Sequence, residues 1–189
     1  MATQSRLKGK RIAALVTDGF EQVELTSPRE ALKTQGAEVS IVSPKRDKVR
    51  GWNHDQPADS FDVDVPITEA VASDFDGLLL PGGVQNPDHL RTDAFVQKFV
   101  KDFFLQHKPV AAICHGPWTL IDAGVVKGRR MTSYHSVRTD LKNAGAEWVD
   151  EQVVVDNGLV TSRNPSDLEA FNAKIVEEYA EGLHEAQHA

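Results

Sequence analysis

The chain of 189 residues has the length of one α/β domain, and 40% hydrophobic with 26% charged residues is the composition of a globular protein. Acidic residues outnumber basic ones by 28 to 21, and the formal charge of −7 makes nucleic acid an unfavourable partner. No apolar run spans a bilayer, and the basic start of the chain lacks the apolar core of a signal peptide. We therefore expect a single cytoplasmic domain over residues 1–189, with its core at about 10–180 and no membrane partner.

Short apolar runs alternate with amphipathic segments along the whole chain. This alternation predicts an α/β fold with a mostly parallel sheet, helices on both faces and a small antiparallel ribbon. The strands are expected, in chain order, at residues 11–17, 38–43, 77–81 and 110–113, with a loop or small hairpin in 44–66 and an edge hairpin around Asn157-Gly158.

Helix signals lie between these strands. Ser27 and Pro28 combine an N-cap residue with a first-turn proline, and they predict a helix over about 27–35. Another helix with a broad apolar face is expected to begin near Thr92. Residues after Glu181 are expected to fray.

The single cysteine, Cys114, stands in the segment Ala-Ile-Cys-His-Gly-Pro between a predicted strand and a predicted helix. This arrangement resembles a nucleophile elbow, in which a sharp turn exposes the nucleophile above the sheet. A lone cysteine is more often a small buried apolar residue. However, the nearby helix terminus and the imidazole of His115 should favour the thiolate, so we expect Cys114 to be reactive.

One cysteine excludes an intrachain disulfide and a thiolate-cluster metal site. The histidines outside the elbow show no spacing that suggests metal ligation, and we expect them at the surface. Neither a metal nor a cofactor is therefore expected.

Two further loops follow predicted strands at the edge of the sheet where open α/β folds bind ligands. Gly83 ends the segment Pro-Gly-Gly, and its N–H could join that of His115 in binding an oxyanion, although two glycines alone can be a simple turn. The segment Gly-Phe-Glu-Gln-Val-Glu places Glu21 and Glu24 on one side of a helical turn. Acidic residues at a helix start are as often solvated as functional.

Several segments appear in one order along about residues 10–180, and as a set they resemble the ThiJ/PfpI family of the class I glutamine amidotransferase-like superfamily. The segments are Gly-Phe-Glu-Gln-Val-Glu, Leu-Leu-Leu-Pro-Gly-Gly, Cys-His-Gly-Pro, Lys-Gly-Arg-Arg, Asn-Ala-Gly-Ala-Glu-Trp and Thr-Ser-Arg. The resemblance implies a flavodoxin-like sandwich.

The resemblance also assigns roles to individual residues. It implies that Cys114 is the nucleophile and that Glu24, rather than Glu21, hydrogen-bonds the thiol. In the peptidase-like branch His115 pairs with a carboxylate of a neighbouring subunit, and Asp88 occupies the matching place. Amidotransferases have a late catalytic histidine where this chain has Asn164, which cannot act as a general base, so glutamine hydrolysis is disfavoured.

The function that the resemblance favours is a stress-protective cysteine hydrolase of the deglycase or glyoxalase type. It would act on methylglyoxal or glyoxal adducts through Cys114 as a homo-oligomer, from dimer to hexamer. One alternative is an intracellular cysteine peptidase that acts on peptides. Another is a non-catalytic redox sensor or chaperone-like stress protein, whose Cys114 is oxidised to a sulfenic or sulfinic acid.

Overall fold

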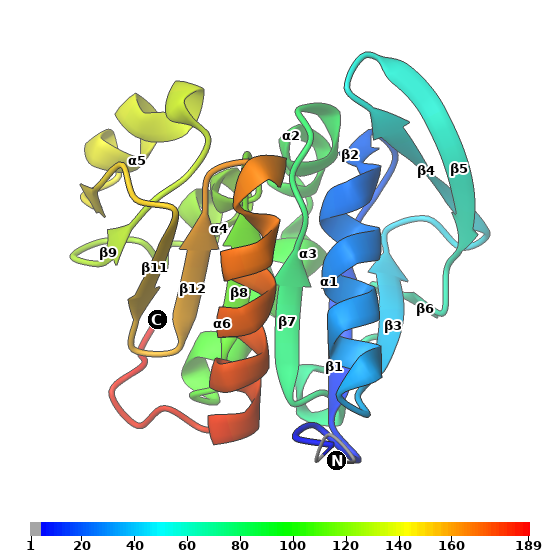
Figure 1. Ribbon diagram of the computed structural model, residues 1–189. Helices are drawn as coiled ribbons and strands as arrows, with labels where there is room; N and C mark the ends of the chain where they lie inside the picture. The colour runs from blue at the N-terminus through cyan, green and yellow to red at the C-terminus, as the bar shows by residue number, and fades with distance from the viewer. Residues whose placement is uncertain (1–4) are drawn as a thin grey trace.

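A computed structural model describes residues 5–189 and has a central sheet of seven strands in the order β11-β12-β8-β7-β1-β3-β6 (Figure 1). All neighbours in this sheet are parallel except β11 and β12, which form the antiparallel hairpin predicted at Asn157-Gly158. The strands are β1 (Arg11–Leu15), β3 (Glu38–Ser43), β6 (Val65–Pro66), β7 (Gly77–Leu80), β8 (Val110–Ile113), β11 (Val153–Asp156) and β12 (Leu159–Ser162). The predicted α/β class is confirmed.

Helices cover both faces of the sheet. Figure 1 shows α1 and α6 on the near face, with α2, α3 and α4 behind the sheet and α5 at its β11 side. The helices are α1 (Gln22–Thr34), α2 (Gln85–Leu90), α3 (Ala94–Leu105), α4 (Pro117–Asp122), α5 (Arg138–Asn143) and α6 (Leu168–Glu181). Among the residues that the structure describes, no helix is long and apolar enough to span a membrane.

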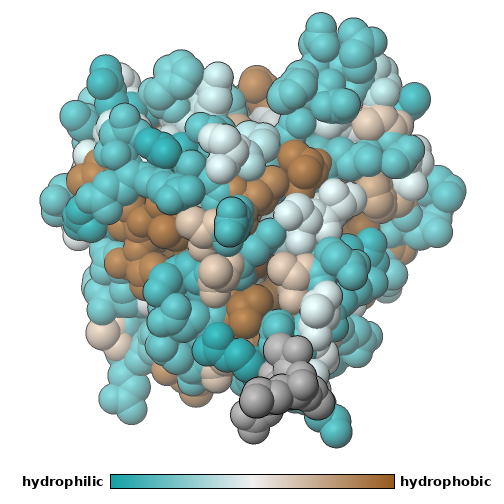
Figure 2. Space-filling model, viewed as in Figure 1, coloured by the Kyte–Doolittle hydropathy of each residue, from teal (hydrophilic) through white to brown (hydrophobic). Residues whose placement is uncertain are grey.

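The core lies in two layers, one on each face of the sheet. Strand β1 divides its side chains between them: Ala13 and Leu15 join the layer under α3, whereas Ile12 and Ala14 join the layer under α1 and α6. Because both faces are buried, the strand is apolar at every one of these positions, which made it recognisable in the sequence. The outer surface over α1 and α6 is mostly polar with scattered apolar patches (Figure 2).

A second, three-stranded sheet lies beyond the carboxyl end of β1. It consists of β2 (Phe20–Glu21), which pairs in parallel with β4 (Lys48–Asn53), and of β5 (Gln56–Asp62), which pairs antiparallel with β4. The hairpin allowed for in segment 44–66 is thus present. Two short strands, β9 (Arg130–Met131) and β10 (Glu147–Trp148), form a separate parallel pair that the sequence did not predict.

The first helix begins earlier than predicted. It starts at Gln22, with Glu21 as the preceding extended residue, and Pro28 lies buried inside it. Proline has no N–H, so the carbonyl of Glu24 loses its usual helical partner. Ser27 is not a cap, because its hydroxyl accepts a hydrogen bond from Asn172 of α6. Pairing of β2 with β4 and packing of α1 on α6 therefore set the helix start.

The segment after Glu181 packs against the body of the protein, which corrects the expectation that it frays. Gln187 is fully buried, and its carbonyl oxygen lies 2.6 Å from Nδ1 of His107. The N–H of His184 donates to the carbonyl of His107, and the Arg129 guanidinium bonds the carbonyl of His188. Backbone contacts with distant residues fix this segment, and no local sequence pattern reveals them.

Candidate active site

Cys114 occupies the tight turn between β8 and α4. Its φ of 63° lies in the left-handed region, which is sparsely populated for residues other than glycine. The turn is fixed by three backbone bonds: the Cys114 N–H donates to Ser162, its carbonyl accepts from Tyr134, and the Gly116 N–H donates to Ile113. Strain that the surrounding backbone maintains is typical of functional positions. The elbow read from the sequence is thus present.

His115 brings a ring nitrogen to the thiol. Its Nδ1 lies 3.1 Å from Sγ of Cys114, and its Nε2 lies 3.1 Å from Oγ of Ser136. The ring stacks on Tyr134 at a centroid distance of 4.7 Å. Burial, and to a lesser extent the nearby His135, lowers the pKa of His115 to about 4. The imidazole is therefore neutral at pH 7 and can accept a proton from the thiol.

Glu24 is fully buried in the first turn of α1. Its Oε2 accepts a 2.8 Å hydrogen bond from the N–H of Gly82, and Oε1 is buried without a hydrogen-bond partner among the described residues. The carboxyl group lies beside the thiol of Cys114. The pKa of this carboxyl is raised to about 8, chiefly by burial, because the opposing effects of the Gly82 N–H and the Cys114 thiol are smaller; the nearby Glu21 also acts to raise it. Glu24 is consequently protonated at pH 7 and can donate a hydrogen bond to sulfur, as the resemblance implied.

The expectation that the resting thiol favours ionisation is wrong. Burial raises the pKa of Cys114 and, where Glu24 is ionised, its carboxylate raises it further, whereas the backbone N–H groups of Gly83 and His115 lower it. Helix α4 has six residues and starts at Pro117, three positions beyond Cys114. The dipole of so short and distant a helix lowers the pKa of the thiol only a little. The neutral imidazole adds no positive charge. A thiol with a base at 3.1 Å is the resting arrangement.

Two glycines after β7 let the main chain approach the nucleophile. A Cβ on Gly82 would lie 2.6 Å from Oε2 of Glu24 and 2.7 Å from Cβ of Cys114. Gly83 has a φ of +75°, and its N–H donates to the sulfur of Cys114. The loop therefore places an N–H donor beside the nucleophile, where the sequence argument located it.

Asn86 holds this loop, and the sequence argument missed it. Its Nδ2 donates to the carbonyls of Pro81 (3.0 Å) and Gly82 (3.1 Å), while its Oδ1 accepts from the N–H of Thr17 (2.7 Å). A fully buried asparagine satisfied in this way ties the β7 loop to the β1 loop. The short helix α2 that carries it has no apolar periodicity, so no sequence pattern predicts the role of Asn86.

These groups meet in a cavity of about 360 Å³ at the carboxyl edge of the sheet. Of the five residues to which the sequence analysis assigned a role, Cys114, His115, Glu24 and Gly83 line it, and Asp88 does not. The lining residues are Glu21, Glu24, His54, Gly83, Val84, Cys114, His115, Tyr134, Asn164 and Pro165. Strands β1, β7 and β8 are neighbours in the sheet, so the loops at their carboxyl ends converge here.

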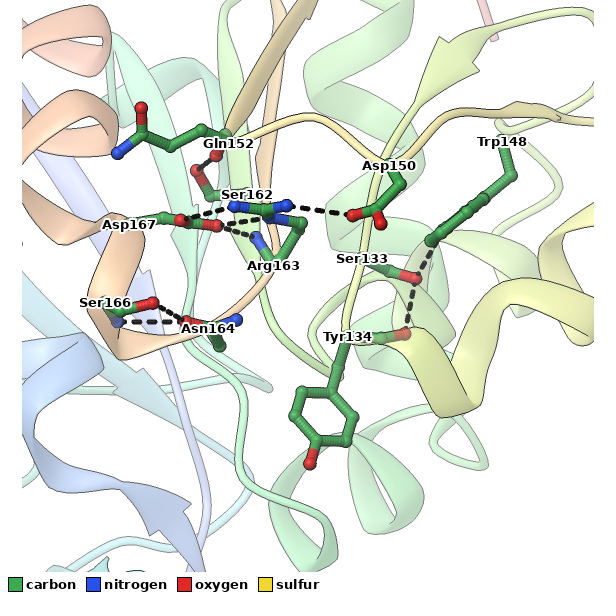
Figure 3. Close-up of polar contacts among 10 residues, drawn as sticks. All are labelled: Ser133, Tyr134, Trp148, Asp150, Gln152, Ser162, Arg163, Asn164, Ser166 and Asp167. Atoms are coloured by element: carbon green, nitrogen blue, oxygen red, sulfur yellow. Dashed lines mark hydrogen bonds and ion pairs between the residues drawn. The ribbon is translucent and has the colours of Figure 1, made fainter.

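One wall of the cavity is a hydrogen-bonded loop that follows β12 (Figure 3). Oδ1 of Asn164 accepts from the N–H and the hydroxyl of Ser166, which leaves the amide nitrogen directed to the side on which Tyr134 lies. Arg163 bonds both carboxylate oxygens of Asp167 and a carboxylate oxygen of Asp150. The loop is thus fixed and presents an amide donor, not a base, to the cavity.

Asp88 lies apart from this cavity within one chain. It is exposed on α2, and its carboxylate has no hydrogen-bond or ion-pair partner among the described residues. The position beside Nε2 of His115 is taken by the hydroxyl of Ser136, which the sequence argument did not identify. A contribution of Asp88 from a neighbouring subunit stays a prediction.

Outside the cavity, one histidine lies close to two carboxylates that could ligate a metal, although the spacing of the histidines in the sequence did not suggest such a cluster. Glu178, Glu181 and His184 bring one potential ligand atom each to within 4.8 Å of one another at the end of α6. His184 lies 3.5 Å from the carboxylate of Glu178. This end of α6 is at the edge of the sheet opposite the cavity (Figure 1), so the group takes no part in the site.

Comparison with known proteins identifies relatives over most of the chain. Residues 10–178 match the DJ-1/PfpI family. "Putative cysteine protease YraA" of Bacillus subtilis and "Protein/nucleic acid deglycase 2" of Escherichia coli are each 47% identical, and each alignment covers 88% of this chain and 96% of the relative. "General stress protein 18" of Bacillus subtilis is 46% identical over 89% of this chain and 96% of its own. The crystal structure of Drosophila melanogaster DJ-1beta superimposes with a TM-score of 0.81 at 30% identity, covering 90% of each chain.

Proposed function

This chain belongs to the DJ-1/PfpI family, and from that premise we propose that it is a stress-protective cysteine hydrolase that removes methylglyoxal or glyoxal adducts. The observation that carries the proposal is the set of groups around Cys114. A neutral imidazole nitrogen lies 3.1 Å from the sulfur, backbone N–H groups donate to it, and the protonated Glu24 faces it. Relatives named deglycase and general stress protein support this choice.

The geometry suggests how the first step proceeds. Nδ1 of His115 takes the thiol proton as sulfur forms a bond to the carbonyl carbon of the adduct, whose π electrons move to its oxygen. The N–H groups of Gly83 and His115 lie beside the sulfur and stabilise that oxygen. Return of the proton from His115 then completes the addition of S–H across the carbonyl.

The overall reaction balances without an external oxidant or cofactor. A methylglyoxal adduct of an amine plus water yields the free amine and lactic acid. The former aldehyde carbon is oxidised to the carboxyl level while the adjacent ketone carbon is reduced to an alcohol. The proposal therefore requires only the adduct, water and the groups of the cavity. We propose further that the protein is a cytoplasmic homo-oligomer whose substrates are small electrophilic adducts.

Two other functions could use the same thiol. A cysteine peptidase would apply the same base and N–H donors to a peptide carbonyl, and the protease name of one relative favours testing it. A redox sensor would oxidise Cys114 to a sulfinic acid, which the protonated Glu24 could stabilise through a hydrogen bond. The three functions differ in the compound that the protein consumes, which is an adduct for the deglycase, a peptide for the peptidase and an oxidant for the sensor.

We expect the protein to release amine and lactate from a methylglyoxal adduct, and Cys114→Ala to abolish this release because the nucleophile is gone. The measurement compares methylglyoxal adducts, free methylglyoxal and a fluorogenic peptide for both proteins. Intact mass after peroxide treatment follows oxidation of Cys114 in parallel. If only the peptide is cleaved, the peptidase reading replaces the deglycase. If nothing is turned over while peroxide adds oxygen to Cys114, the protein is a sensor.

Asp88 is proposed to act on His115 of a neighbouring subunit. If so, neither Cys114→Ala nor Asp88→Asn alone is active, but their mixture regains part of the wild-type turnover through hybrid oligomers. The measurement is turnover before and after mixing under conditions that allow subunit exchange. Asp88→Asn with wild-type turnover would remove Asp88 from the site and leave Ser136 as the partner of His115.

A further inference from the structure

Three potential metal ligands meet at the carboxyl end of α6. Glu178 and Glu181 lie three positions apart in its last turn, and Gly182, with a φ of +88°, turns the chain so that His184 lies beside them. One ligand atom of each of the three side chains lies within 4.8 Å of the others. The backbone N–H of His184 donates to the carbonyl of His107, so a distant part of the chain holds the histidine in place.

The carboxylate of Glu178 is buried without a hydrogen-bond donor. Glu178 is 6% exposed, and none of the residues that the structure describes donates a hydrogen bond to its carboxylate. The side chain that lies beside it is His184, with Nε2 3.5 Å from the carboxylate, and this is another member of the group. Burial raises the pKa of Glu178. A buried carboxylate of this kind needs a cation or hydrogen-bond donors.

This end of α6 is negatively charged. The carbonyl groups of the last turn carry the negative end of the helix dipole, and both carboxylates of the group lie beside them. The lysines in this region form ion pairs elsewhere: Lys174 with Glu177 at 2.7 Å and Lys10 with Asp76 at 3.7 Å. A divalent cation would supply the positive charge that the group lacks.

The amide of Gln187 is a second buried polar group without a partner. Gln187 is fully buried, and neither Oε1 nor Nε2 has a hydrogen-bond partner among the described residues. A Cβ on Gly158, in the β11–β12 hairpin, would collide with this Oε1 and would lie 2.7 Å from Cδ2 of His184, the ring carbon next to Nε2. The glycine therefore leaves room for the amide oxygen beside the imidazole. Buried amides are rarely left unsatisfied, so this oxygen points to a ligand at the group.

We propose that Glu178, Glu181 and His184 bind a divalent transition-metal ion, with Zn²⁺ as the ion to test. The amide oxygen of Gln187 completes the set as a fourth ligand. Zinc takes carboxylate and imidazole ligands at about 2.0–2.2 Å, and rotation of the exposed Glu181 side chain closes the set to that size. The imidazole favours such an ion over Ca²⁺ or Mg²⁺, which prefer oxygen ligands. The bound ion fastens the segment after Glu181 to α6, at the edge of the sheet opposite the catalytic cavity (Figure 1).

Zinc binding to the full chain tests the inference, in a Cys114→Ala parent that lacks the thiol as a competing ligand. Calorimetric titration of the chelator-treated parent with ZnCl₂ should give one ion per chain, and zinc should raise its Tm. Glu181→Gln, at an exposed position, and His184→Gln should each weaken zinc affinity roughly tenfold or more, because even outer-shell partners of a metal commonly contribute that much. Gln187→Leu should also weaken it, and should raise the Tm of the zinc-free protein by removing an unpartnered amide.

Glu185→Gln and His188→Gln are the matched controls, because each removes the same kind of side chain from an exposed position of the C-terminal segment. Both should keep the zinc affinity of the parent and its rise in Tm. A parent that binds no zinc would overturn the inference. Equal affinity in Glu181→Gln, His184→Gln and the two controls would also overturn it, since it would reveal an adventitious ion only. Unchanged affinity in Gln187→Leu would overturn the place of the amide as fourth ligand. These measurements follow no turnover, so their failure leaves the proposed function standing.

Discussion

Replacing Glu24 with glutamine is expected to raise the free energy of unfolding by about 3 kcal/mol at pH 7. The pKa of Glu24 rises from 4.5 to about 8 in the folded protein, chiefly because the carboxyl is buried. Between these two values the folded state binds more protons than the unfolded state. Stability conferred by the protonated carboxyl is therefore complete below pH 4.5 and is lost as the pH rises through 8. Glutamine does not titrate and avoids this loss.

The measurement is urea unfolding of both proteins from pH 4.5 to 8.5. The difference in unfolding free energy should be small at the acid end, grow with pH and level off above about pH 8. Glu30→Gln is the control, because Glu30 is an exposed glutamate of the same helix. A difference that does not vary with pH would show that Glu24 is ionised in the folded state, with the N–H of Gly82 compensating its charge.

The strands at the centre of the fold could be predicted because their sequence carries the signal. Strands β3 and β8 match the predicted bounds 38–43 and 110–113. Strand β8 is buried at every position and is a continuous apolar run, whereas β3 interrupts its apolar residues with Glu38 and Ser40. The start of α1 could not be predicted in this way. Pairing of β2 with β4, which are about 30 positions apart, places Glu21 in extended backbone and starts the helix at the next residue.

The site likewise has residues that could be predicted from the sequence and residues that could not. Cys114, Gly83 and Glu24 follow neighbouring parallel strands, so chain order and topology bring them together. Ser136 reaches His115 from a segment that is attached to the elbow by the bond from the Tyr134 N–H to Cys114, and no local pattern reveals that bond. The direction in which the pKa of Cys114 shifts was also predicted wrongly, because it depends on how deeply the sulfur is buried.

Gly83→Ala should destabilise the protein by several kcal/mol and lower turnover by roughly 10²- to 10³-fold. A Cβ at this position would lie 2.4 Å from the carbonyl oxygen of Gly19 and 2.7 Å from the backbone nitrogen of Glu21. Both are main-chain atoms of the loop that leads into α1, so neither can yield without moving the loop. The Gly83 N–H would be displaced from the sulfur, and the oxyanion would lose a donor.

Gly124→Ala separates this collision from the cost of the backbone conformation. Gly124 has a φ of +74°, against +75° for Gly83, but a Cβ there has no atom within 4 Å. Both alanines pay roughly 1 to 2 kcal/mol for the left-handed conformation, and only Gly83→Ala adds the collision. Urea unfolding and turnover of the two variants are compared. Equal destabilisation with turnover retained in Gly83→Ala would show that the loop can yield and that its N–H does not serve the reaction.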